Sequence, residues 1–333
     1  MKSEASVVAH PNIALSKYWG KREGRGRFPA VPSLSVTLAG LATRTRVRFD
    51  DALEEDRLTL NDSVVVGPER ERAVELLDRV RAVTRDARKA DIVSTNDFPT
   101  ASGLASSASG FAALALAAVR AADLDWDAPR VSDLARRSSA SAARSVFGGY
   151  VELASAPLHP PDDHFLAAHS VAPADHLPIV VFVCVTTEQP KAIGSTDGMR
   201  LTLTHSPYAR AWLDEAPRLH GRLREALLGR DFPEVGRLAE ASALAMHASA
   251  MAAGVVYWTA ATLDLLAAVR SMRAGGIDAF ATIDAGPHVK VLAMPCDAER
   301  LRAALPAVPG VRRVVETRPG EGARVDDGEA RQP

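Results

Sequence analysis

A run of small residues between positions 99 and 108 is the strongest candidate for anion binding. It reads Pro-Thr-Ala-Ser-Gly-Leu-Ala-Ser-Ser-Ala and leads directly into a segment of helical character. The first amides of a helix have no partner within it, and the helix dipole makes that end positive. Small side chains would let a phosphate approach these amides, and serine hydroxyls can donate to it or bind Mg²⁺. On composition alone, the alternative is a helix rich in alanine and serine that packs tightly against a sheet.

An acid and an arginine stand where they could act on a substrate. Asp284 follows an apolar strand and precedes Ala-Gly-Pro, so its carboxylate could accept or orient a hydroxyl proton. An aspartate before Gly-Pro can instead cap a turn. Arg144 lies among serines and alanines before a Gly-Gly pair, and its guanidinium can hold a carboxylate through two hydrogen bonds. The alternative for Arg144 is an exposed surface position.

Two lysines and two aromatic residues share the short segment 17–21, Lys-Tyr-Trp-Gly-Lys. In an extended chain Lys17 and Lys21 lie on one face and Tyr18 points the other way. The lysines could bind an anion, and a cation near Asp284 would keep that carboxylate ionised. The alternative is that the aromatic residues belong to the core and that the lysines are solvated.

The elements that must position these residues follow from hydrophobic periodicity. In the first half we expect strands at 33–38, 43–49, 92–94 and 151–154, a hairpin at 58–66, and helices at 69–89, 103–122 and 132–145, the last capped by Ser132. In the second half we expect strands at 179–186, 279–284, 289–294 and 311–316, and helices at 206–228, 232–251, 259–274 and 298–305.

This order of elements predicts an α+β fold in two layers rather than a doubly wound parallel sheet. We expect an N-terminal domain over residues 1–178, which carries the small-residue loop, and a C-terminal domain over residues 179–317, which carries Asp284. Residues 156–178 should connect the two domains. The polar residues 318–333 should form a disordered tail.

Composition excludes several classes of function. The 333 residues include 40 Lys plus Arg and 41 Asp plus Glu, and aromatic residues make up 5%, which argues against a nucleic-acid partner. Two cysteines, Cys184 and Cys296, are too few for a disulfide framework. The N-terminal residues lack the apolar core of a signal peptide, and no stretch is apolar enough for a membrane span. We expect a cytoplasmic protein whose partner is a small molecule.

Five segments together resemble a known family. The small-residue loop is similar to the phosphate loop of the GHMP kinase superfamily, named for galacto-, homoserine, mevalonate and phosphomevalonate kinases. Four further segments resemble its mevalonate diphosphate decarboxylase branch, and they span residues 12–22, 33–38, 141–149 and 283–287. Lys-Tyr-Trp-Gly-Lys and Asp-Ala-Gly-Pro are specific to that branch.

The resemblance implies the fold and the reaction. The fold would be that of GHMP kinases, with an N-terminal ribosomal-protein-S5-domain-2-like α/β domain and a C-terminal ferredoxin-like α/β domain. The reaction would consume ATP, with Mg²⁺, and phosphorylate the tertiary 3-hydroxyl of mevalonate 5-diphosphate. Loss of that phosphate together with CO2 would leave isopentenyl diphosphate. The resemblance also implies a homodimer.

The resemblance assigns roles to residues at matching positions. It implies that the catalytic residues are Asp284, Lys17 and Arg144, and that the substrate is bound by Tyr18, Lys21, Ser141, Arg144 and Ser195. The candidates for ATP binding are Ser94, Asn96, Pro99, Ser102, Gly103, Leu104, Ala105, Ser106 and Ser107. Ser107 is also the candidate ligand of Mg²⁺. Ser94 and Asn96 are included because they stand just before the loop.

The chain departs from the family pattern around the substrate. Ala140 and Ala143 replace a glycine and a cysteine, Pro32 replaces an asparagine or serine, and His288 replaces an asparagine. These changes leave open a decarboxylase that acts on mevalonate 5-phosphate. A kinase that stops at the 3-phosphate and a nucleotide or metabolite sensor without turnover are further alternatives.

Overall fold

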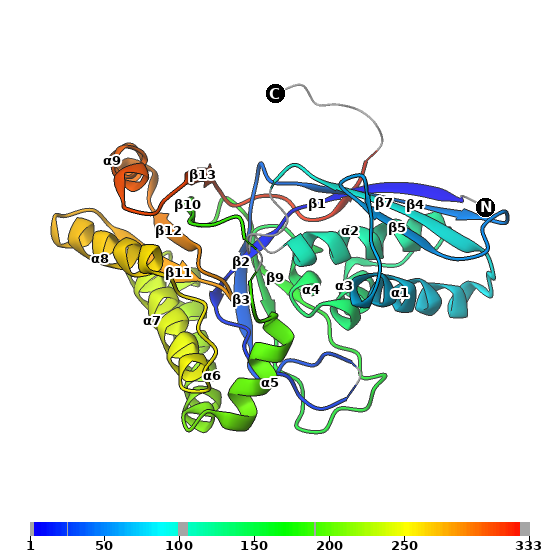
Figure 1. Cartoon of the computed structure of the whole chain (residues 1–333), viewed down its shortest axis with the longest axis horizontal. Coiled ribbons are helices and arrows are strands. Elements are labelled where there is room, and N and C mark those ends of the chain that lie inside the picture. Colours follow the sequence, from blue (N-terminus) through cyan, green and yellow to red (C-terminus); the bar gives the residue numbers. More distant parts are fainter. Residues whose placement is uncertain (1–2, 25, 99–105, 190, 327–333) are drawn as a thin grey trace.

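Three β-sheets form the framework of the protein (Figure 1). The computed structural model describes residues 3–24, 26–98, 106–189 and 191–326. Most neighbouring strands are antiparallel, and β5 and β7 form a parallel pair. The α+β prediction is therefore confirmed, and the helices lie on the faces of these sheets.

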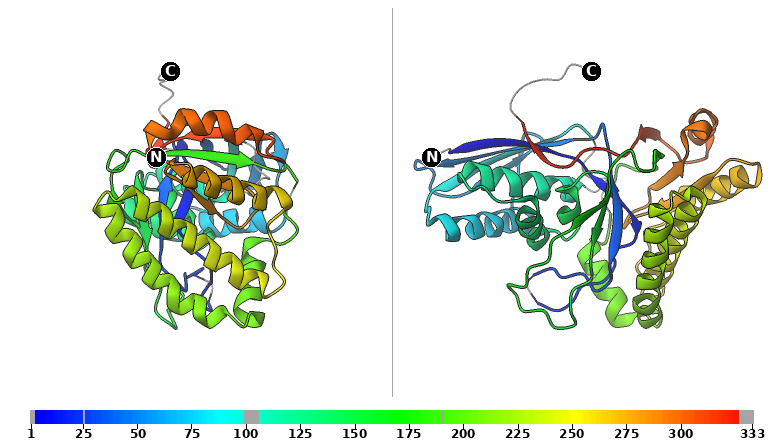
Figure 2. Two further views of the ribbon diagram at one scale, coloured as in Figure 1. Left: turned by 90° about the vertical axis from the view of Figure 1, so that its left-hand side faces the viewer. Right: turned by 180° about the vertical axis from the view of Figure 1, so that it is seen from behind.

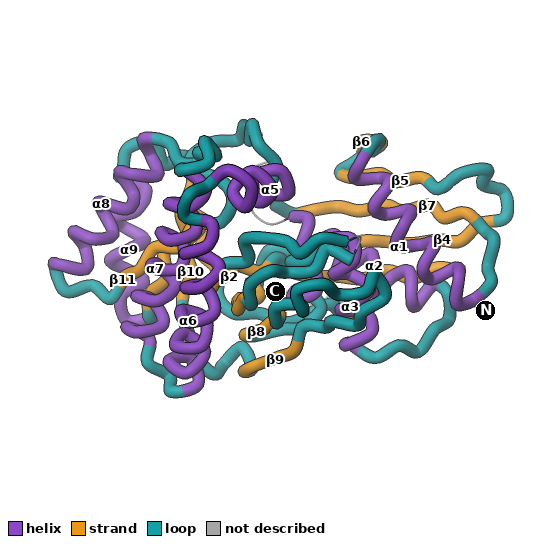
Figure 3. Tube along the Cα trace, turned by 90° about the horizontal axis from the view of Figure 1, so that it is seen from below, coloured by secondary structure: helices purple, strands orange, loops and turns teal. Residues whose placement is uncertain are grey.

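The first sheet supports the helix that follows the small-residue loop. Its order is β14–β1–β4–β7–β5–β6, and its strands span Arg324–Val325, Glu4–Ala9, Thr43–Asp50, Lys89–Asn96, Arg57–Leu60 and Ser63–Val64. Helices α1, α2, α3 and α4 cover one face and span Pro68–Thr84, Ser106–Ala121, Ala128–Ser138 and Ala142–Ser145. Helix α2 is buried around most of its circumference because its residues are small and apolar, and it lies between the sheet and the other helices (Figure 1). Figure 3 shows α1, α2 and α3 on the same face of this sheet, seen from below.

The second and third sheets share a hydrophobic core with the later helices. The second has the order β2–β3–β8–β9, with strands at Asn12–Ser16, Ser33–Thr37, Tyr150–Leu153 and His169–Ala172. The third has the order β11–β12–β10–β13, with strands at Ala279–Ile283, Val289–Ala293, Val180–Val185 and Arg313–Thr317. Helices α5 to α9 span Ser195–His205, Ala209–Leu228, Phe232–Met251, Ala260–Ala274 and Ala298–Ala304. One core cluster joins β2, β3 and β10 to α6 and α7, so the second sheet lies between the two ends of the molecule (Figure 1).

The hairpin and several helices agree with the sequence. Asn61 and Asp62 both adopt positive φ, 46° and 62°, which is the geometry of a tight two-residue hairpin turn. Helix α7 has the predicted bounds. Helix α1 is shorter than predicted because Arg85 adopts φ 58° and ends it, and Lys89 already belongs to β7.

The prediction of one capped helix from Ser132 is wrong. Helix α3 begins at Ala128, where Asp127 caps it by accepting from the Arg130 amide and a proline occupies the first turn. Aspartate followed by proline at this position is a stronger start signal than an internal serine. Ser132 instead lies inside α3 and is fully buried; its hydroxyl donates to the Ala143 carbonyl and accepts from the Ala168 amide.

Several elements were absent from the sequence prediction, namely β1, β2, β9, β14 and α5. Residues 156–178, expected as a connection, contain strand β9 at the edge of the second sheet. Helix α5, over Ser195–His205, precedes the predicted helix, which begins at Ala209 rather than at Ser206. The chain leaves helical geometry between α5 and α6 because Pro207 disfavours that geometry for the residue before it, Ser206.

The prediction of a disordered tail is wrong for residues 318–326. The Gly320 amide donates to the Thr37 carbonyl at 2.8 Å, and the Gly149 amide donates to the Gly320 carbonyl at 2.9 Å. Strand β14 then pairs with β1, so the end of the described chain closes the first sheet (Figure 2). Residues 327–333 lie outside the described residues.

Candidate active site

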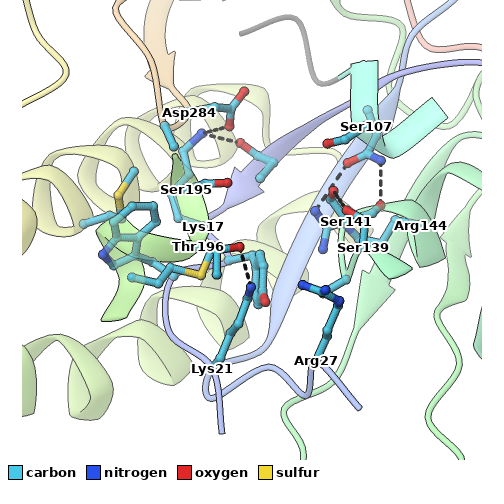
Figure 4. A pocket seen from close by; sticks show the side chains of 18 of the residues that line it. Lys17, Lys21, Arg27, Ser107, Ser139, Ser141, Arg144, Ser195, Thr196 and Asp284 are labelled. Atoms are coloured by element: carbon cyan, nitrogen blue, oxygen red, sulfur yellow. Dashed lines mark hydrogen bonds and ion pairs between the residues drawn. The ribbon is translucent and has the colours of Figure 1, made fainter. Parts of the chain in front are cut away.

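A single pocket collects the charged residues that the sequence singled out (Figure 4). We call it the central pocket; its lining includes Lys17, Tyr18, Lys21, Ser107, Ser141, Arg144, Ser195 and Asp284. These residues come from the segments that follow β2 and β11, from α4 and the residue before it, and from the starts of α2 and α5. Stretches that are more than 100 residues apart in the chain therefore meet at one place.

An aspartate held by two lysines lies at one side of this pocket. Lys17 Nζ donates to Asp284 Oδ1 at 2.8 Å and to the Ala14 carbonyl at 2.8 Å. Lys290 Nζ lies 3.1 Å from Asp284 Oδ2. Both lysine side chains are almost fully buried, 2% and 3% exposed, whereas that of Asp284 is 25% exposed. The carboxylate is therefore the member of this trio that the pocket can reach most easily.

The electrostatics of the trio favour an ionised aspartate. Burial by itself would raise the pKa of Asp284, but the ammonium groups of Lys17 and Lys290 outweigh burial and hold that pKa below its usual value. Burial lowers the pKa of Lys17 to about 8, against the opposing effect of Asp284. Such an aspartate is a weak base, and its charge persists at neutral pH.

Arg144 projects from α4 and is held by neutral oxygens. Its Nη1 donates to Ser33 Oγ at 2.7 Å, its Nε to Ser35 Oγ at 3.0 Å, and its Nη2 to Asn12 Oδ1 at 3.3 Å. Ser33 and Ser35 are two residues apart on β3, so their side chains point to the same face of the sheet. Burial lowers the pKa of Arg144 to about 10, so it stays charged at neutral pH. Among the described residues no carboxylate forms an ion pair with Arg144, and a substrate carboxylate would supply the missing counter-charge.

Further cations line the other side of the central pocket. Lys21 Nζ donates to Thr196 Oγ1 at 2.8 Å, and Arg27 and Arg72 line the same region. Burial, followed by the charges of Arg27 and Arg72, lowers the pKa of Lys21 to about 8. Figure 4 shows Lys21 and Arg27 rising into the pocket beside each other. A cluster of positive charges of this kind is suited to a phosphate or diphosphate group.

The prediction that Tyr18 points away from the two lysines is wrong, because Tyr18, Lys17 and Lys21 line the same pocket. Strand β2 ends at Ser16, so the alternation of an extended chain does not continue through this segment. Among the described residues the buried Tyr18 hydroxyl has no hydrogen-bond partner. An unpartnered buried hydroxyl at a pocket wall fits contact with a polar ligand.

The residues predicted to bind ATP lie at a neighbouring pocket. Ser94, Asn96, Ser106 and Ser107 line it together with apolar side chains such as Phe111, and Ser107 also lines the central pocket. The start of α2 therefore separates the two pockets, where its first amides could hold a phosphate chain between them. Part of the predicted loop lies outside the described residues, namely Pro99, Ser102, Gly103, Leu104 and Ala105.

The described residues contain no group of three or more histidine, cysteine, aspartate or glutamate side chains that could hold a metal ion. The hydroxyl of Ser107, at the junction of the pockets, remains the candidate ligand for Mg²⁺.

Sequence reasoning missed several residues of the site. Asn12, Ser33 and Ser35 lie within the family-like segments 12–22 and 33–38, which gave them no role, yet they hold Arg144. Lys290 was passed over although it is a lone charge in the apolar strand Val-Lys-Val-Leu-Ala. A lysine in a buried strand needs a partner, and that signal could have identified it. Arg27 and Arg72 carried no comparable signal.

Comparisons with known proteins identify the family. The model of the diphosphomevalonate decarboxylase-like N-terminal domain matches residues 9–159, and that of the mevalonate 5-diphosphate decarboxylase C-terminal domain matches residues 181–323. A diphosphomevalonate decarboxylase of Candida albicans is 31% identical, over 96% of each chain. This chain belongs to the mevalonate diphosphate decarboxylase family.

Solved structures of the mevalonate diphosphate decarboxylase family agree with the fold. The enzyme from Staphylococcus aureus superposes with a TM-score of 0.90 at 32% identity, covering 98% of both chains. A structure described as MDDEF in complex with MVAPP, AMPPCP and magnesium gives a TM-score of 0.88 at 35% identity, covering 97% of this chain and 98% of that chain. The family also has a relative with another substrate: a phosphomevalonate decarboxylase of Haloferax volcanii is 34% identical, over 81% of this chain and 82% of its own.

Proposed function

We propose that this protein catalyses the ATP-dependent decarboxylation of (R)-mevalonate 5-diphosphate to isopentenyl diphosphate, ADP, phosphate and CO2, a step of isoprenoid biosynthesis. The observation that carries the proposal is the single pocket that Asp284 and Lys17 share with Arg144, beside the start of α2. The related structure in complex with MVAPP, AMPPCP and magnesium supports the binding of a substrate, a nucleotide and Mg²⁺.

Asp284 acts on the 3-hydroxyl in this proposal. Its carboxylate orients the hydroxyl toward the terminal phosphate of ATP. As the new O–P bond forms, the bond between that phosphorus and the ADP oxygen breaks, and the hydroxyl proton passes to the Asp284 carboxylate. Because Lys17 and Lys290 keep the pKa of Asp284 low, orientation contributes more than early proton abstraction. A loose phosphoryl transition state requires little proton transfer before the bond forms.

Arg144 holds the C1 carboxylate of the substrate. In the second half of the reaction the C3–O bond breaks and releases phosphate, the C1–C2 bond breaks, and its electrons form the C2–C3 double bond as CO2 leaves. The carboxylate loses its charge in this step, so a very strong ion pair would retard it. Arg144 has three neutral partners that fix its position independently of the substrate.

The remaining residues anchor the phosphates. Tyr18, Lys21, Ser141 and Ser195 bind the 5-diphosphate, and Ser94, Asn96 and the residues before α2 bind ATP. Mg²⁺ held by Ser107 and the nucleotide would neutralise charge on the transferring phosphate. The neighbouring pocket combines apolar walls with Ser94 and Asn96, a lining that fits a planar base with polar edges.

The test of the proposal is a product assay. The protein is incubated with ATP, Mg²⁺ and mevalonate 5-diphosphate, and CO2, isopentenyl diphosphate and ADP are measured. Equal amounts of all three are expected. ADP without CO2 would indicate a kinase that stops at the 3-phosphate, and ligand binding without any product would indicate a sensor.

The same chemistry on mevalonate 5-phosphate is the second candidate. Two observations favour it. Ala140, which replaces a glycine of the family pattern, lines the central pocket. The chain is also similar to the phosphomevalonate decarboxylase of Haloferax volcanii. The cluster of Lys21, Arg27 and Arg72 favours the more highly charged diphosphate. A comparison of kcat/KM for the two substrates decides between them.

The assembly and the location belong to the same proposal. We expect a homodimer because the family resemblance implies one, and sedimentation equilibrium would measure it. We expect the protein in the cytoplasm, where fractionation would find it. No helix within the described parts of the chain has the length and apolar character that spanning a membrane requires.

A further inference from the structure

Lys290 contacts the Asp284 carboxylate from outside the central pocket. It lies on β12, opposite Thr282 of β11, and its side chain reaches past the end of β11 to Asp284 Oδ2 at 3.1 Å. It is 3% exposed and does not line the pocket, in contrast to Lys17. The two ammonium groups therefore hold different oxygens of one carboxylate.

This arrangement constrains the carboxylate more than a single lysine would. The terminal torsion of an aspartate has a broad energy profile, so a group held at one oxygen can rotate. A second cation on the other oxygen limits that rotation and keeps the plane of the carboxylate constant. A reacting hydroxyl needs an acceptor in a defined place, and an error of about 1 Å can cost two orders of magnitude in rate.

We infer that Lys290 is a positioning residue for the reaction: it holds Asp284 Oδ2 from behind the pocket and thereby fixes the carboxylate that meets the substrate hydroxyl. This inference rests on the proposed function. It differs from a purely structural role, because it predicts changes in kcat and in the titration of Asp284 that a role in the fold alone would not produce.

Other charged groups also face Asp284 and must be considered in any test that uses pH. His247 of α7 approaches the Asp284 carbonyl at 3.2 Å, and burial lowers its pKa to about 4. Lys191 donates to the Ala285 carbonyl at 3.2 Å, and Arg144 and Lys17 act from the pocket. His247 is neutral throughout the range from pH 5 to 9, and His288, whose pKa burial and Lys290 lower to about 3, is neutral there too. Burial and Lys290 also lower the pKa of Lys191, so the pH–rate profile reports on Asp284, Lys17 and Lys191 together, and a signal from the Asp284 carboxyl itself is needed to separate them.

The experiment compares wild type with Lys290→Met and Lys290→Arg. For Lys290→Met we expect kcat to fall about tenfold or more with KM changed less than threefold, because orientation rather than substrate contact is lost. Removal of a positive charge raises the pKa of both Asp284 and Lys17, so both limbs of the pH–rate profile move to higher pH. Lys290→Arg keeps the charge and restores most of the profile.

A readout without turnover separates this inference from the proposed function. In protein labelled with carboxyl-¹³C aspartate, the Asp284 signal is assigned by its loss in Asp284→Asn. It should titrate at higher pH in Lys290→Met than in wild type, whichever substrate the protein uses. Absence of product from wild type would overturn the proposed function, whereas an unshifted Asp284 titration in Lys290→Met would overturn the role of Lys290.

The matched control is Arg273→Met. Arg273 forms an ion pair with the mostly buried Glu240 at 3.0 Å and donates to the Ala279 carbonyl at the far end of β11. We expect this variant to lose stability while its pH–rate profile stays unchanged. A wild-type kcat and profile in Lys290→Met would overturn the inference. Failure of both Lys290→Met and Lys290→Gln to fold would also overturn it, since it would assign Lys290 to the fold alone.

Discussion

At the scale of single residues, this site depends on how each charge is compensated. Asp284 has two cationic partners, whereas Arg144 has hydrogen bonds to neutral oxygens. The acid is therefore satisfied before the substrate arrives, and the arginine still lacks a counter-ion among the described residues. This contrast fits the roles proposed for them, because Asp284 stays in place during the reaction and Arg144 receives a charged group.

Replacement of Asp284 should separate turnover from nucleotide binding. We expect Asp284→Ala to lose turnover by at least about a hundredfold, in line with the loss of a positioned acid–base group. ATP affinity should stay within about threefold, because the pocket of Ser94 and Asn96 does not include Asp284. Steady-state kinetics and titration with a fluorescent ATP analogue measure the two effects. Near-normal turnover would contradict the role of Asp284.

Replacement of Arg144 by lysine should also be severe. Lysine keeps the charge but cannot reproduce the planar fork that contacts Ser33, Ser35 and Asn12 while facing a carboxylate. We expect kcat/KM to fall by about 10² or more, with CO2 and ADP formation lost together. A variant that still forms ADP without CO2 would show that Arg144 serves only the decarboxylation half.

Burial of Lys17 makes the stability of Asp284→Ala depend on pH in a different range from that of wild type. The folded pKa of Lys17, about 8, lies below its ordinary value of 10.5, so the unfolded chain binds more protons between these values and stability rises with pH. Without the carboxylate the pKa of Lys17 falls further, and the rise should begin at lower pH than in wild type. Urea unfolding from pH 6 to 10 measures the difference. Parallel curves for the two proteins would contradict the coupling of Lys17 to Asp284.

At the scale of elements, the site depends on close packing at positions away from the charged residues themselves. Helix α7 crosses β11, whose end bears Asp284, and Gly236 of α7 lies against the Phe280 ring. A Cβ at position 236 would overlap that ring. Glycine is needed here for the approach of two elements rather than for a turn.

We therefore expect Gly236→Ala to destabilise the protein by about 1–3 kcal/mol through overpacking. The matched control is Gly221→Ala on α6, where a Cβ has no atom within 4 Å; it should be neutral or stabilising by up to ~1 kcal/mol, since alanine favours a helix. Urea unfolding measures both. Equal stability of the two variants would show that β11 can shift away from α7 at no cost.

At the scale of the whole molecule, the C-terminal segment of the described chain packs against strands near the N-terminus. Residues after β13 pass between Ala39 and Gly148, and a Cβ at Gly320 or Gly322 would meet backbone at 2.6 Å. They then add β14 to the edge of the first sheet beside β1. The C-terminal segment thus joins the sheet that supports α2 to the sheet that supports Asp284.

A chain that ends at Thr317 should consequently be less stable. It loses the hydrogen bonds of Gly320 and the pairing of β14, each backbone bond contributing about 1 kcal/mol, so its Tm should fall by several degrees. A chain that ends at Asp326 keeps those contacts and is the control. Calorimetry measures both, and an unchanged Tm for the shorter chain would contradict a structural role for residues 318–326.

Much of this protein could be predicted from its sequence, because the information was local. The spacing of apolar residues predicted most strands and helices, including the bounds of α7. The motifs around Lys17, Arg144 and Asp284 indicated the family and three charged residues that meet in the central pocket. These signals depend on residues that are neighbours in the chain, where periodicity and turn chemistry operate.

Only the tertiary structure decided which distant residues contact those of the site. The hydroxyls that hold Arg144, the second lysine on Asp284, the cations beside Lys21 and the pairing of β14 with β1 all join segments far apart in sequence. A buried charge requires a partner, but the chain does not state which distant residue supplies it. The physical reason is that such partners are chosen by the packing of whole sheets and helices, a property of the folded molecule rather than of any stretch of residues.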